Sequence, residues 1–466
     1  MQTLKSFWLL ILLFLSISTL LAQNTGDIRG FVYEKDTGEP MVYTNVVLKG
    51  TTYGAATDLN GFFSINQVPA GDYLLTCTLV GFDTATVNIK VVPGRIINEK
   101  LYLSESTGLL QEVVVGASKE EAKTEIRIST IKITPKQITK IPAIGGEPDL
   151  AQYLQIIPGV VFTGDQGGQL YIRGGSQIQT KVLLDGMTIY NPFHSIGLFS
   201  VFETDLIRNV DVITGGFSGL YSGRISAVID ITTRDGNQKS HSGKISTNTF
   251  LSKVLLEGPI SRLKDDGYGV SSSYVFTAKT SYLNKTSPVL YPYIGELPYS
   301  FTDLYGKWTI NLLNGSKFSL SGFRYIDDAQ FASQAEYGWD QWGTAANFVI
   351  VPGQSKIIID GFFSYSNYAL DLIEATDDRP RTTSIGGFNG GVNFSYYLPK
   401  GDIKYGIEVS GFNTTFEFYN PLGIKLDANQ STTEIGGYFK YKANLFNNKL
   451  LFEPSIRSNF YASLPA

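Results

Sequence analysis

From about Ser242 to the end of the chain, apolar and polar residues alternate with a period of two. One series carries Leu, Ile, Val and aromatic side chains, and the other carries Ser, Thr, Asn and Lys, as in residues 304–312 and 392–398. Because successive side chains of a strand point to opposite sides, this pattern predicts strands with one apolar and one polar face. After residue 21 there is no run of roughly 18 apolar residues, so we expect any membrane crossing to be made by strands.

The connections between these strands alternate in length. The short ones are 314–316, 352–355, 399–402 and 447–448, and the long ones are 284–301, 328–343, 371–386 and 416–431. Short turns at one end and long loops at the other are typical of outer-membrane barrels, whereas a soluble sandwich has no reason to sort its loops in this way. We therefore expect residues 241–466 to be part of a transmembrane antiparallel β-barrel that begins with a tight hairpin at 242–260.

The number of strands indicates half of such a barrel. The pattern predicts about 11 strands, whereas plugged outer-membrane transporters have about 22. Since an open sheet edge in lipid leaves backbone groups without hydrogen bonds, the barrel must close. We interpret the sequence as truncated within the barrel.

The composition excludes several classes of function. Charged residues make up 17% of the chain and the formal net charge is −4, so the basic field of a nucleic-acid-binding protein is absent. The one cysteine, Cys77, cannot form an internal disulfide, and neither His194 nor His241 has the neighbouring ligands of a zinc site. We expect no metal, no cofactor and no catalytic residues, and hence no enzyme.

Residues 1–22 have the layout of a cleavable secretory signal. Lys5 precedes an apolar run that ends at Leu21, and Ala22 is a small residue before a polar segment. A membrane anchor is the alternative, but the run is shorter than the roughly 20 apolar residues that a spanning helix needs. We expect export from the cytoplasm and cleavage after Ala22.

Residues 23–103 alternate in short runs separated by turn residues, which predicts a small β-sandwich. Within it, Asn60-Gly61 indicates a hairpin, because a type I′ turn needs positive φ at both central positions. The stretch IRGFVYEKDTGEPMVYTNVVLKGTTYGAATDLNGFFSI resembles the carboxypeptidase-regulatory-like domain, a prealbumin-type sandwich. This resemblance implies an accessory module without zinc ligands.

Residues 104–142 form a polar linker that contains one island of high strand propensity. The island consists of Glu112, Val113, Val114, Val115, Gly116 and Ala117. One interpretation is an edge strand added to a neighbouring domain. The other is β-augmentation, in which an extended peptide pairs with the sheet edge of another protein.

Residues 143–240 combine strand-like segments, Gly-rich turns and short amphipathic stretches, which predicts a compact α+β unit. Its motifs are PGV at 158–160, IRG at 172–174, LLDG at 183–186, VDVITGG at 210–216 and VIDITTR at 228–234. This series resembles the plug domain of the TonB-dependent outer-membrane receptors. The resemblance implies that residues 112–117 are the TonB box, and the preceding sandwich is similar to the arrangement of Bacteroidetes-type receptors.

The expected fold is therefore mainly β: a small β-sandwich, an α+β plug domain, and the N-terminal half of a transmembrane antiparallel β-barrel. Candidate residues for the gate of the plug are Arg173, Gly174, Gly175, Asp185 and Gly186. The simpler interpretations are a turn whose Arg173 pairs with carboxylates of the barrel wall, and a hairpin turn at Asp185-Gly186. His194 is interpreted as a packed or loop histidine.

The expected loop 327–343 is rich in aromatic and acidic residues. Candidate ligand contacts in it are Phe331, Tyr337, Trp339 and Trp342. Aromatic rings at this position would stack on sugars or organic chelates. Barrels also carry aromatic girdles at the membrane interfaces, which is the alternative interpretation.

The resemblance implies an outer-membrane receptor that imports a nutrient, such as a glycan, a peptide or a siderophore, into the periplasm. Its expected partners are TonB with the inner-membrane energising complex, outer-membrane lipid, the small-molecule or oligomeric nutrient, and a surface lipoprotein. The front sandwich and the plug are expected on the periplasmic side. The alternative is a secreted or surface all-β binding or adhesion protein without transport, which would need neither a plug nor a TonB box.

Overall fold

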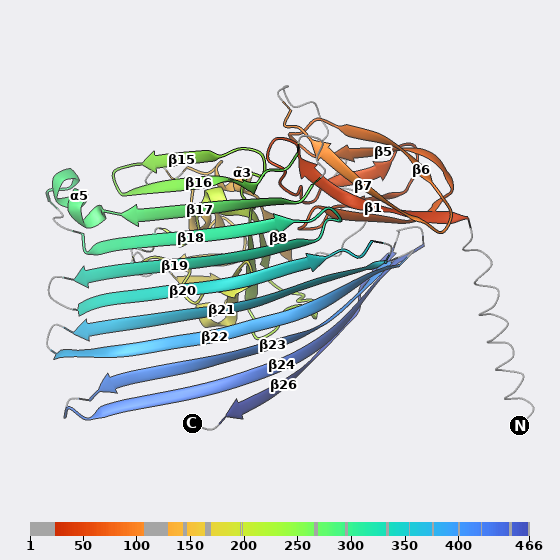
Figure 1. Cartoon of the computed structure of the whole chain (residues 1–466). Coiled ribbons are helices and arrows are strands. Elements are labelled where there is room, and N and C mark those ends of the chain that lie inside the picture. Colours follow the sequence, from red (N-terminus) through yellow and green to blue (C-terminus); the bar gives the residue numbers. More distant parts are fainter. Residues whose placement is uncertain are drawn as a thin grey trace, which may run out of the picture.

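The computed structural model divides into three parts, which Figure 1 shows in sequence colours. We refer to them as the front domain (24–106), the plug (129–236) and the barrel sheet (242–464). The residues that the structure describes are 24–106, 129–142, 147–163, 169–195, 197, 199–264, 269–293, 297–331, 335–353, 355–374, 377–398, 401–420, 422–446 and 450–464. The expected mainly β fold is confirmed. No helix in this described part has the length and hydropathy needed to cross a membrane.

The front domain is a sandwich of two sheets with the strand orders β4-β1-β7 and β3-β2-β5-β6. Its strands are β1 (Thr25–Glu34), β2 (Asn45–Leu48), β3 (Gly54–Ala56), β4 (Phe62–Pro69), β5 (Gly71–Thr78), β6 (Ala85–Val91) and β7 (Ile96–Leu103). Alternate apolar residues, among them Ile28, Leu75 and Cys77, fill the core between the sheets. Burial raises the pKa of Cys77 to about 12, so its thiol is unreactive.

The predicted hairpin at Asn60-Gly61 is wrong. This turn joins β3 to β4, and these strands belong to different sheets. Asp58 Oδ1 accepts hydrogen bonds from the N–H groups of Asn60 at 2.8 Å and Phe62 at 2.9 Å. Only Gly61 of the two central residues has a positive φ, 74°, so the turn is not type I′. The side chain of Asp58 thus sets a crossing between sheets that the Asn-Gly pair alone does not reveal.

The plug is built on a mixed sheet with the order β12-β11-β14-β13-β8. The strands of this sheet are β8 (Thr130–Ile133), β11 (Thr180–Leu184), β12 (Met187–Thr188), β13 (Ile207–Ile213) and β14 (Ala227–Thr233). The remaining elements are α3 (Pro135–Ile138), α4 (Leu150–Leu154), β9 (Val160–Thr163), β10 (Gln169–Ile172), and the 3-10 turns η2 (Gln177–Gln179) and η3 (Thr204–Leu206). β11 and β14 run parallel, and their nearly continuous apolar runs are buried, as parallel strands require.

The barrel sheet is antiparallel, and its strands pair in sequence order. They are β15 (Ser242–Thr247), β16 (Leu251–Ser261), β17 (Ser271–Ser281), β18 (Tyr299–Asn311), β19 (Lys317–Phe331), β20 (Ala335–Ile350), β21 (Ile357–Glu374), β22 (Asp377–Leu398), β23 (Gly401–Tyr419), β24 (Lys425–Leu445), β25 (Leu450–Phe452) and β26 (Ser455–Leu464). The expected hairpin at 242–260 is confirmed by β15 and β16. β25 and β26 both pair with β24, so they act as one interrupted strand. Within the described residues, β15 and β26 lie at the two edges.

Three of the four expected long loops are mostly strand. In 328–343, 371–386 and 416–431, the ladders continue to the pairs Phe331↔Ala335, Glu374↔Asp377 and Tyr419↔Lys425. Main-chain hydrogen bonds need no apolar face, so these hairpins continue where the apolar pattern weakens. The fourth segment contains α5 (Leu283–Leu290).

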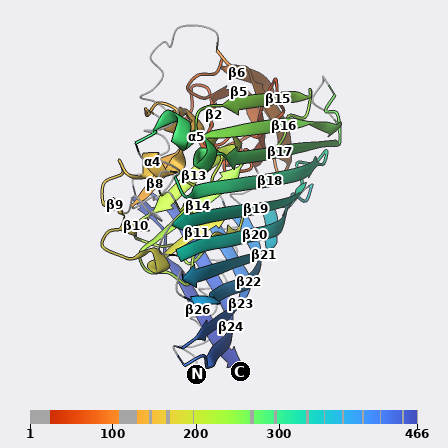
Figure 2. The same cartoon turned by 90° about the vertical axis from the view of Figure 1, so that its left-hand side faces the viewer.

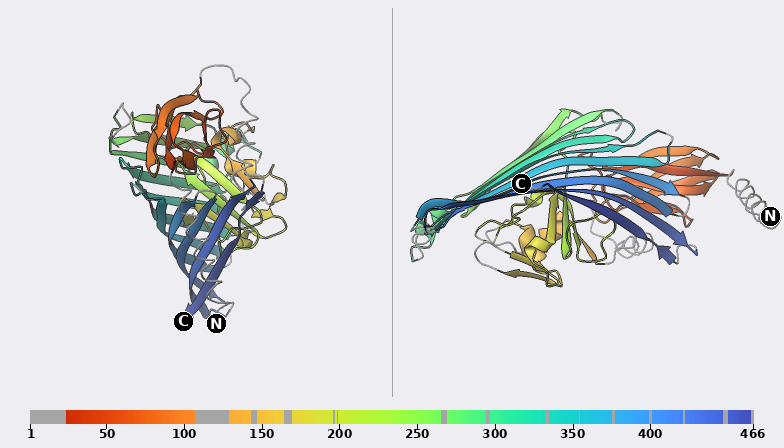
Figure 3. Two further views of the ribbon diagram at one scale, coloured as in Figure 1. Left: turned by 90° about the vertical axis from the view of Figure 1, so that its right-hand side faces the viewer. Right: turned by 90° about the horizontal axis from the view of Figure 1, so that it is seen from below.

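The barrel sheet is curved, and the plug lies against its concave face (Figures 2 and 3). On β18, Asp303, Tyr305 and Lys307 point to this side and are buried, whereas Leu304 and Trp308 of the opposite face are exposed. The barrel sheet, which we also call the wall, is therefore polar toward the plug and apolar on its outer surface. The front domain lies at the end of the strands that bears the short turns, opposite α5 (Figure 1).

Candidate functional site at the contact between plug and wall

The Asp185-Gly186 turn joins β11 to β12 and lies in contact with the wall. Its φ angles are 49° at Asp185 and 86° at Gly186, as the predicted two-residue hairpin requires. The carboxylate of Asp185 accepts hydrogen bonds from Thr233 N–H at 2.9 Å, from Thr233 Oγ1 at 2.6 Å and from Tyr305 O–H of β18 at 2.7 Å. One side chain thus holds two plug strands together and binds them to the wall.

The backbone of the same turn contacts two further strands. Asn347 of β20 donates a hydrogen bond from Nδ2 to the carbonyl of Asp185 at 3.1 Å, and Ser364 of β21 donates from Oγ to the carbonyl of Gly186 at 2.9 Å. Both gate candidates of this turn therefore lie at the wall, where any movement of the plug must break these hydrogen bonds.

We expect Gly186→Ala to lower the free energy of unfolding by about 1–2 kcal/mol, because a Cβ disfavours the left-handed φ of this residue. The matched control is Gly353→Ala, since Gly353 has an ordinary φ and open space around a Cβ. Urea unfolding of both variants, followed by tryptophan fluorescence, measures the difference. Equal stability of the two variants would contradict a strained turn.

The second gate candidate, Arg173-Gly174-Gly175, is also a turn, but it lies away from the wall. Ile172 and Gly175 form a bridge, and φ is 48° at Arg173 and 80° at Gly174. The exposed Arg173 donates from Nη2 to Ser129 Oγ at 3.2 Å. The expected pairing of Arg173 with wall carboxylates is wrong, because the turn at the end of β10 directs the guanidinium toward the start of β8.

His194 is fully buried and lies between two aspartates of the wall. Its Nε2 is 3.0 Å from Asp303 Oδ2 on β18, and its Nδ1 is 2.9 Å from Asp327 Oδ2 on β19. The imidazole also stacks on Phe301, with 3.8 Å between ring centroids. Ser195 donates from its N–H to Asp327 at 3.0 Å. Of the two predicted alternatives, a packed or a loop histidine, the packed one is confirmed, and His194 is the central contact of this region.

The geometry of this contact defines the charge of His194. Each ring nitrogen faces a carboxylate, and an ionised carboxylate only accepts hydrogen bonds, so two N–H donors are required. Burial lowers the pKa of His194, but the charges and hydrogen bonds of Asp303 and Asp327 outweigh it and hold the pKa above its usual value. Lys279 of β17 adds a second cation, 3.0 Å from Asp303. His194 of the plug and Lys279 of the wall thus neutralise the two carboxylates of the wall.

The aromatic candidates for ligand contact lie on strands, so the expected loop at 327–343 is wrong. Trp339 is only 2% exposed and lies 6.0 Å from His194 between ring centroids, so it packs against the plug. Trp342 is 41% exposed on the outer face, which fits the alternative of a membrane girdle. Tyr337 is partly buried against the same core, and Phe331 ends β19, with a side chain outside the described residues. Ligand contact by these residues stays a prediction.

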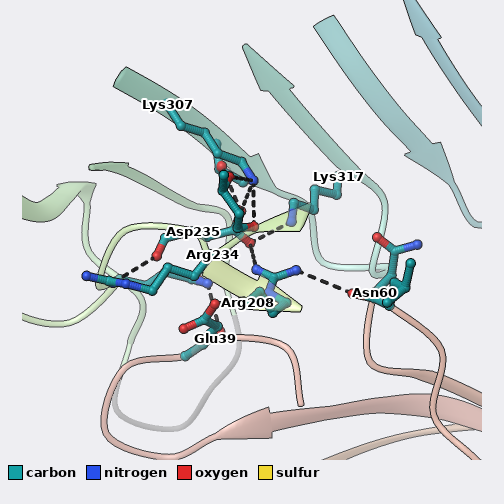
Figure 4. Close-up of polar contacts among 12 residues, drawn as sticks. Glu39, Asn60, Arg208, Arg234, Asp235, Lys307 and Lys317 are labelled. Atoms are coloured by element: carbon teal, nitrogen blue, oxygen red, sulfur yellow. Dashed lines mark hydrogen bonds and ion pairs between the residues drawn. The ribbon is translucent and has the colours of Figure 1, made fainter. Parts of the chain in front are cut away.

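A second buried charge cluster joins all three parts of the protein (Figure 4). Asp235 follows β14 and pairs with Arg208 of the plug at 3.0 Å and with two wall lysines, Lys317 at 2.5 Å and Lys307 at 3.3 Å. Arg208 also pairs with Glu39 of the front domain at 3.0 Å. Burial raises the pKa of Asp235, but the three cations hold it well below its usual range. This carboxylate therefore stays ionised at neutral pH.

Two further predictions fall on residues 112–117 and 1–22, which lie outside the described residues. The TonB box and the signal peptide therefore stay predictions from the sequence.

Two family models match the chain. Residues 28–115 match the CarboxypepD_reg-like domain, and residues 122–228 match the TonB-dependent receptor plug domain. The TonB-dependent receptor SusC of Bacteroides thetaiotaomicron is 28% identical over 249 residues. The chain thus contains a CarboxypepD_reg-like domain and a TonB-dependent receptor plug domain, and it is similar to TonB-dependent receptors.

The alignments with curated members of the TonB-dependent receptor family are partial. The match to SusC covers 50% of this chain and 24% of SusC, and the TonB-dependent transporter Oar of Myxococcus xanthus is 24% identical over 45% of this chain and 20% of Oar. The chain thus spans about a quarter of the length of the curated relatives it matches.

Solved structures of the family share the fold. The ferric enterobactin receptor PfeA of Pseudomonas aeruginosa has a TM-score of 0.54 at 12% identity, over 75% of this chain and 59% of PfeA. The FrpB iron transporter of Neisseria meningitidis has a TM-score of 0.55 at 14% identity, over 72% of this chain and 59% of FrpB. TonB-dependent receptors are outer-membrane proteins, and these relatives are receptors and transporters, not enzymes.

Proposed function

We propose that this chain acts in an outer-membrane receptor that imports a nutrient, such as a glycan, a peptide or a siderophore, with energy delivered by TonB. The observation that carries the proposal is the polar contact between plug and wall. Beside the apolar residues that the plug and the wall bury together, Asp185, His194 and Asp235 bind the plug to the wall through hydrogen bonds and ion pairs. Polar contacts of this kind hold a closed plug and exchange for water when it moves.

The proposed coupling acts on the N-terminal side of the plug. TonB pairs with residues 112–117 by β-augmentation and pulls on the chain that enters the plug at Ser129. The first element to receive the force is β8, an edge strand that pairs with β13 over only four residues. An edge strand is separated from its sheet more easily than a central one, so we expect β8 to open before the contacts at Asp185 and His194.

The proposed orientation places the short turns and the front domain in the periplasm, and the long hairpins outside the cell, where the nutrient binds. Residues 1–22 direct export, and a surface lipoprotein covers the long hairpins. Outer-membrane lipid contacts the apolar outer face, which includes Trp308 and Leu320. In lipid, the edge strands β15 and β26 need strand partners, because unpaired backbone groups are costly there.

The test is the binding of the periplasmic C-terminal domain of TonB to a peptide that spans residues 104–123. We expect the native peptide to bind and Val114→Pro to weaken binding about tenfold or more, since proline removes a backbone donor and disfavours a paired strand. The matched control is Val114→Ile, which keeps a β-branched side chain and should bind like the native peptide. Absence of binding by the native peptide, or equal binding by all three, would contradict the coupling.

A further inference from the structure

The front domain is seated on the short turns of the barrel sheet through one buried arginine. Arg29 of β1 is only 4% exposed. Its Nη2 donates to the carbonyls of Pro352 and Gly353, both at 2.6 Å, and its Nη1 donates to the carbonyl of Ser355. Asn98 Oδ1 accepts from Arg29 Nε at 2.6 Å and orients the guanidinium. Three carbonyls of one barrel turn thus converge on one cation.

We call the contact between the front domain and the short turns of the barrel sheet the seat. Polar contacts on either side of Arg29 extend it. Lys356 Nζ, next to the same turn, pairs with Asp27 of β1 at 2.6 Å. Asn66 of β4 donates from Nδ2 to the carbonyl of Leu398, at the end of β22, at 3.0 Å. The front domain therefore spans neighbouring hairpin ends of the wall.

A small apolar cluster completes the contact. Phe31 and Phe62 of the front domain pack with Val351 of the wall, and the ring of Phe62 lies 5.5 Å from that of Tyr397 between centroids. The ring of Phe31 also lies against the turn between β18 and β19, at Gly315, where a Cβ would overlap it. The contact therefore combines polar groups, which water can hydrate when the front domain separates, with a small apolar cluster that separation would expose.

Above this seat, a cavity of about 1310 Å³ lies between the front domain, the plug and the polar face of the wall. Its lining includes Asn60, Phe62 and Asn66 of the front domain, Asp230 of the plug, and Asn393 and Lys404 of the wall. A polar solute that passes between the plug and this part of the wall enters the cavity, and the front domain bounds it at the end with the short turns.

We propose that the front domain is the floor of this exit compartment, that the Arg29 contact holds it closed, and that it must undock before a polar solute leaves. The proposal rests on the proposed function, because it assigns the cavity to the path of the imported nutrient. It gives the front domain a role in release that is separate from coupling to TonB.

The test measures access to the cavity without any substrate. Asn393→Cys places a thiol in the lining, while the buried Cys77 stays unreactive. The full-length receptor in lipid nanodiscs is treated with N-ethylmaleimide or with a bulky polyethylene-glycol maleimide. We expect the small reagent to label the thiol and the bulky one to label it slowly. Adding Arg29→Glu should raise labelling by the bulky reagent about tenfold, because access follows the undocked population.

A second variant and a control keep this test independent of the folding of the front domain. Lys356→Glu acts from the wall, where it places a carboxylate opposite Asp27, and should also increase labelling. Arg95→Glu makes the same charge change at an exposed position of the front domain and should leave labelling unchanged. Two results would contradict the proposal that the front domain closes the cavity. One is fast labelling by the bulky reagent without any change at Arg29, and the other is no increase in labelling in either Arg29→Glu or Lys356→Glu. The TonB peptide assay is unaffected by these outcomes and separates this failure from failure of the coupling.

Discussion

Replacement of His194 by alanine is expected to destabilise the closed plug by roughly 3–5 kcal/mol, the cost of removing one partner of a buried ion pair. The imidazolium satisfies the carboxylates of Asp303 and Asp327, both nearly inaccessible to water. Without it, Lys279 remains as the partner of Asp303, while Asp327 keeps, among the residues that the structure describes, the hydrogen bonds from Ser195.

Trp339 provides the measurement, because its ring lies 6.0 Å from that of His194. Urea unfolding of the full chain, followed by tryptophan fluorescence, should give a lower midpoint for His194→Ala than for the native protein. The matched control is His241→Ala, which removes the other histidine of the chain from an exposed position. The double change His194→Ala with Asp327→Asn should recover part of the loss, since it removes the unpaired charge. Equal midpoints for the two histidine variants would contradict the prediction that His194 stabilises the closed plug.

The same contact predicts a pH dependence with a definite sign. The pKa of His194 is raised in the folded protein. Its contribution to the free energy of unfolding is therefore fully present at pH values below the pKa of an unfolded histidine, about 6.5. The contribution is lost as the pH rises through the folded pKa. We therefore expect the urea midpoint to fall from about pH 6 toward about pH 9 in the native protein, and to fall less in His194→Ala. A midpoint that rises over this range would contradict the assignment of the charge.

The sequence predicts local features of this molecule well, because each depends on residues close together in the chain. The alternation along β18 specifies which side chains face the plug, and Asp185-Gly186 specifies a two-residue hairpin through its need for positive φ. The prediction failed at Asn60-Gly61, where Asp58 organises a crossing between sheets. It failed also at 328–343, where the ladder continues beyond the apolar pattern.

The contacts between plug and wall could not be predicted in the same way. His194 is 109 residues from Asp303 and 133 from Asp327, and their meeting depends on how the plug is seated in the wall. One signal was present: aspartates on the polar faces of predicted strands need a partner if a plug covers them. The sequence does not specify which cation provides it, and Arg173, the expected one, points elsewhere.

Asp235→Asn is expected to lower the stability of the closed plug by a similar amount, roughly 3–5 kcal/mol. Here cations, and not a carboxylate, lose their partner. This change keeps the shape of the side chain but leaves the buried Arg208 and Lys307 and the partly buried Lys317 without their shared carboxylate. Arg208 keeps its ion pair with Glu39, so the front domain stays attached to the plug while the plug loosens from the wall.

The matched control for Asp235→Asn is Asp340→Asn, because Asp340 pairs with Arg324 on the outer surface, where the side chains are 37% and 56% exposed. An exposed pair of this kind contributes less than about 1 kcal/mol, so the control should unfold close to the native midpoint. Asp235 has a pKa below its usual range, so its contribution is present above the unfolded value of about 3.9 and is lost as the pH falls through the folded pKa. The difference between native protein and Asp235→Asn should therefore persist from neutral pH to about pH 4 and shrink only in stronger acid. A difference that disappears already near pH 6 would show that the cluster is held by another group.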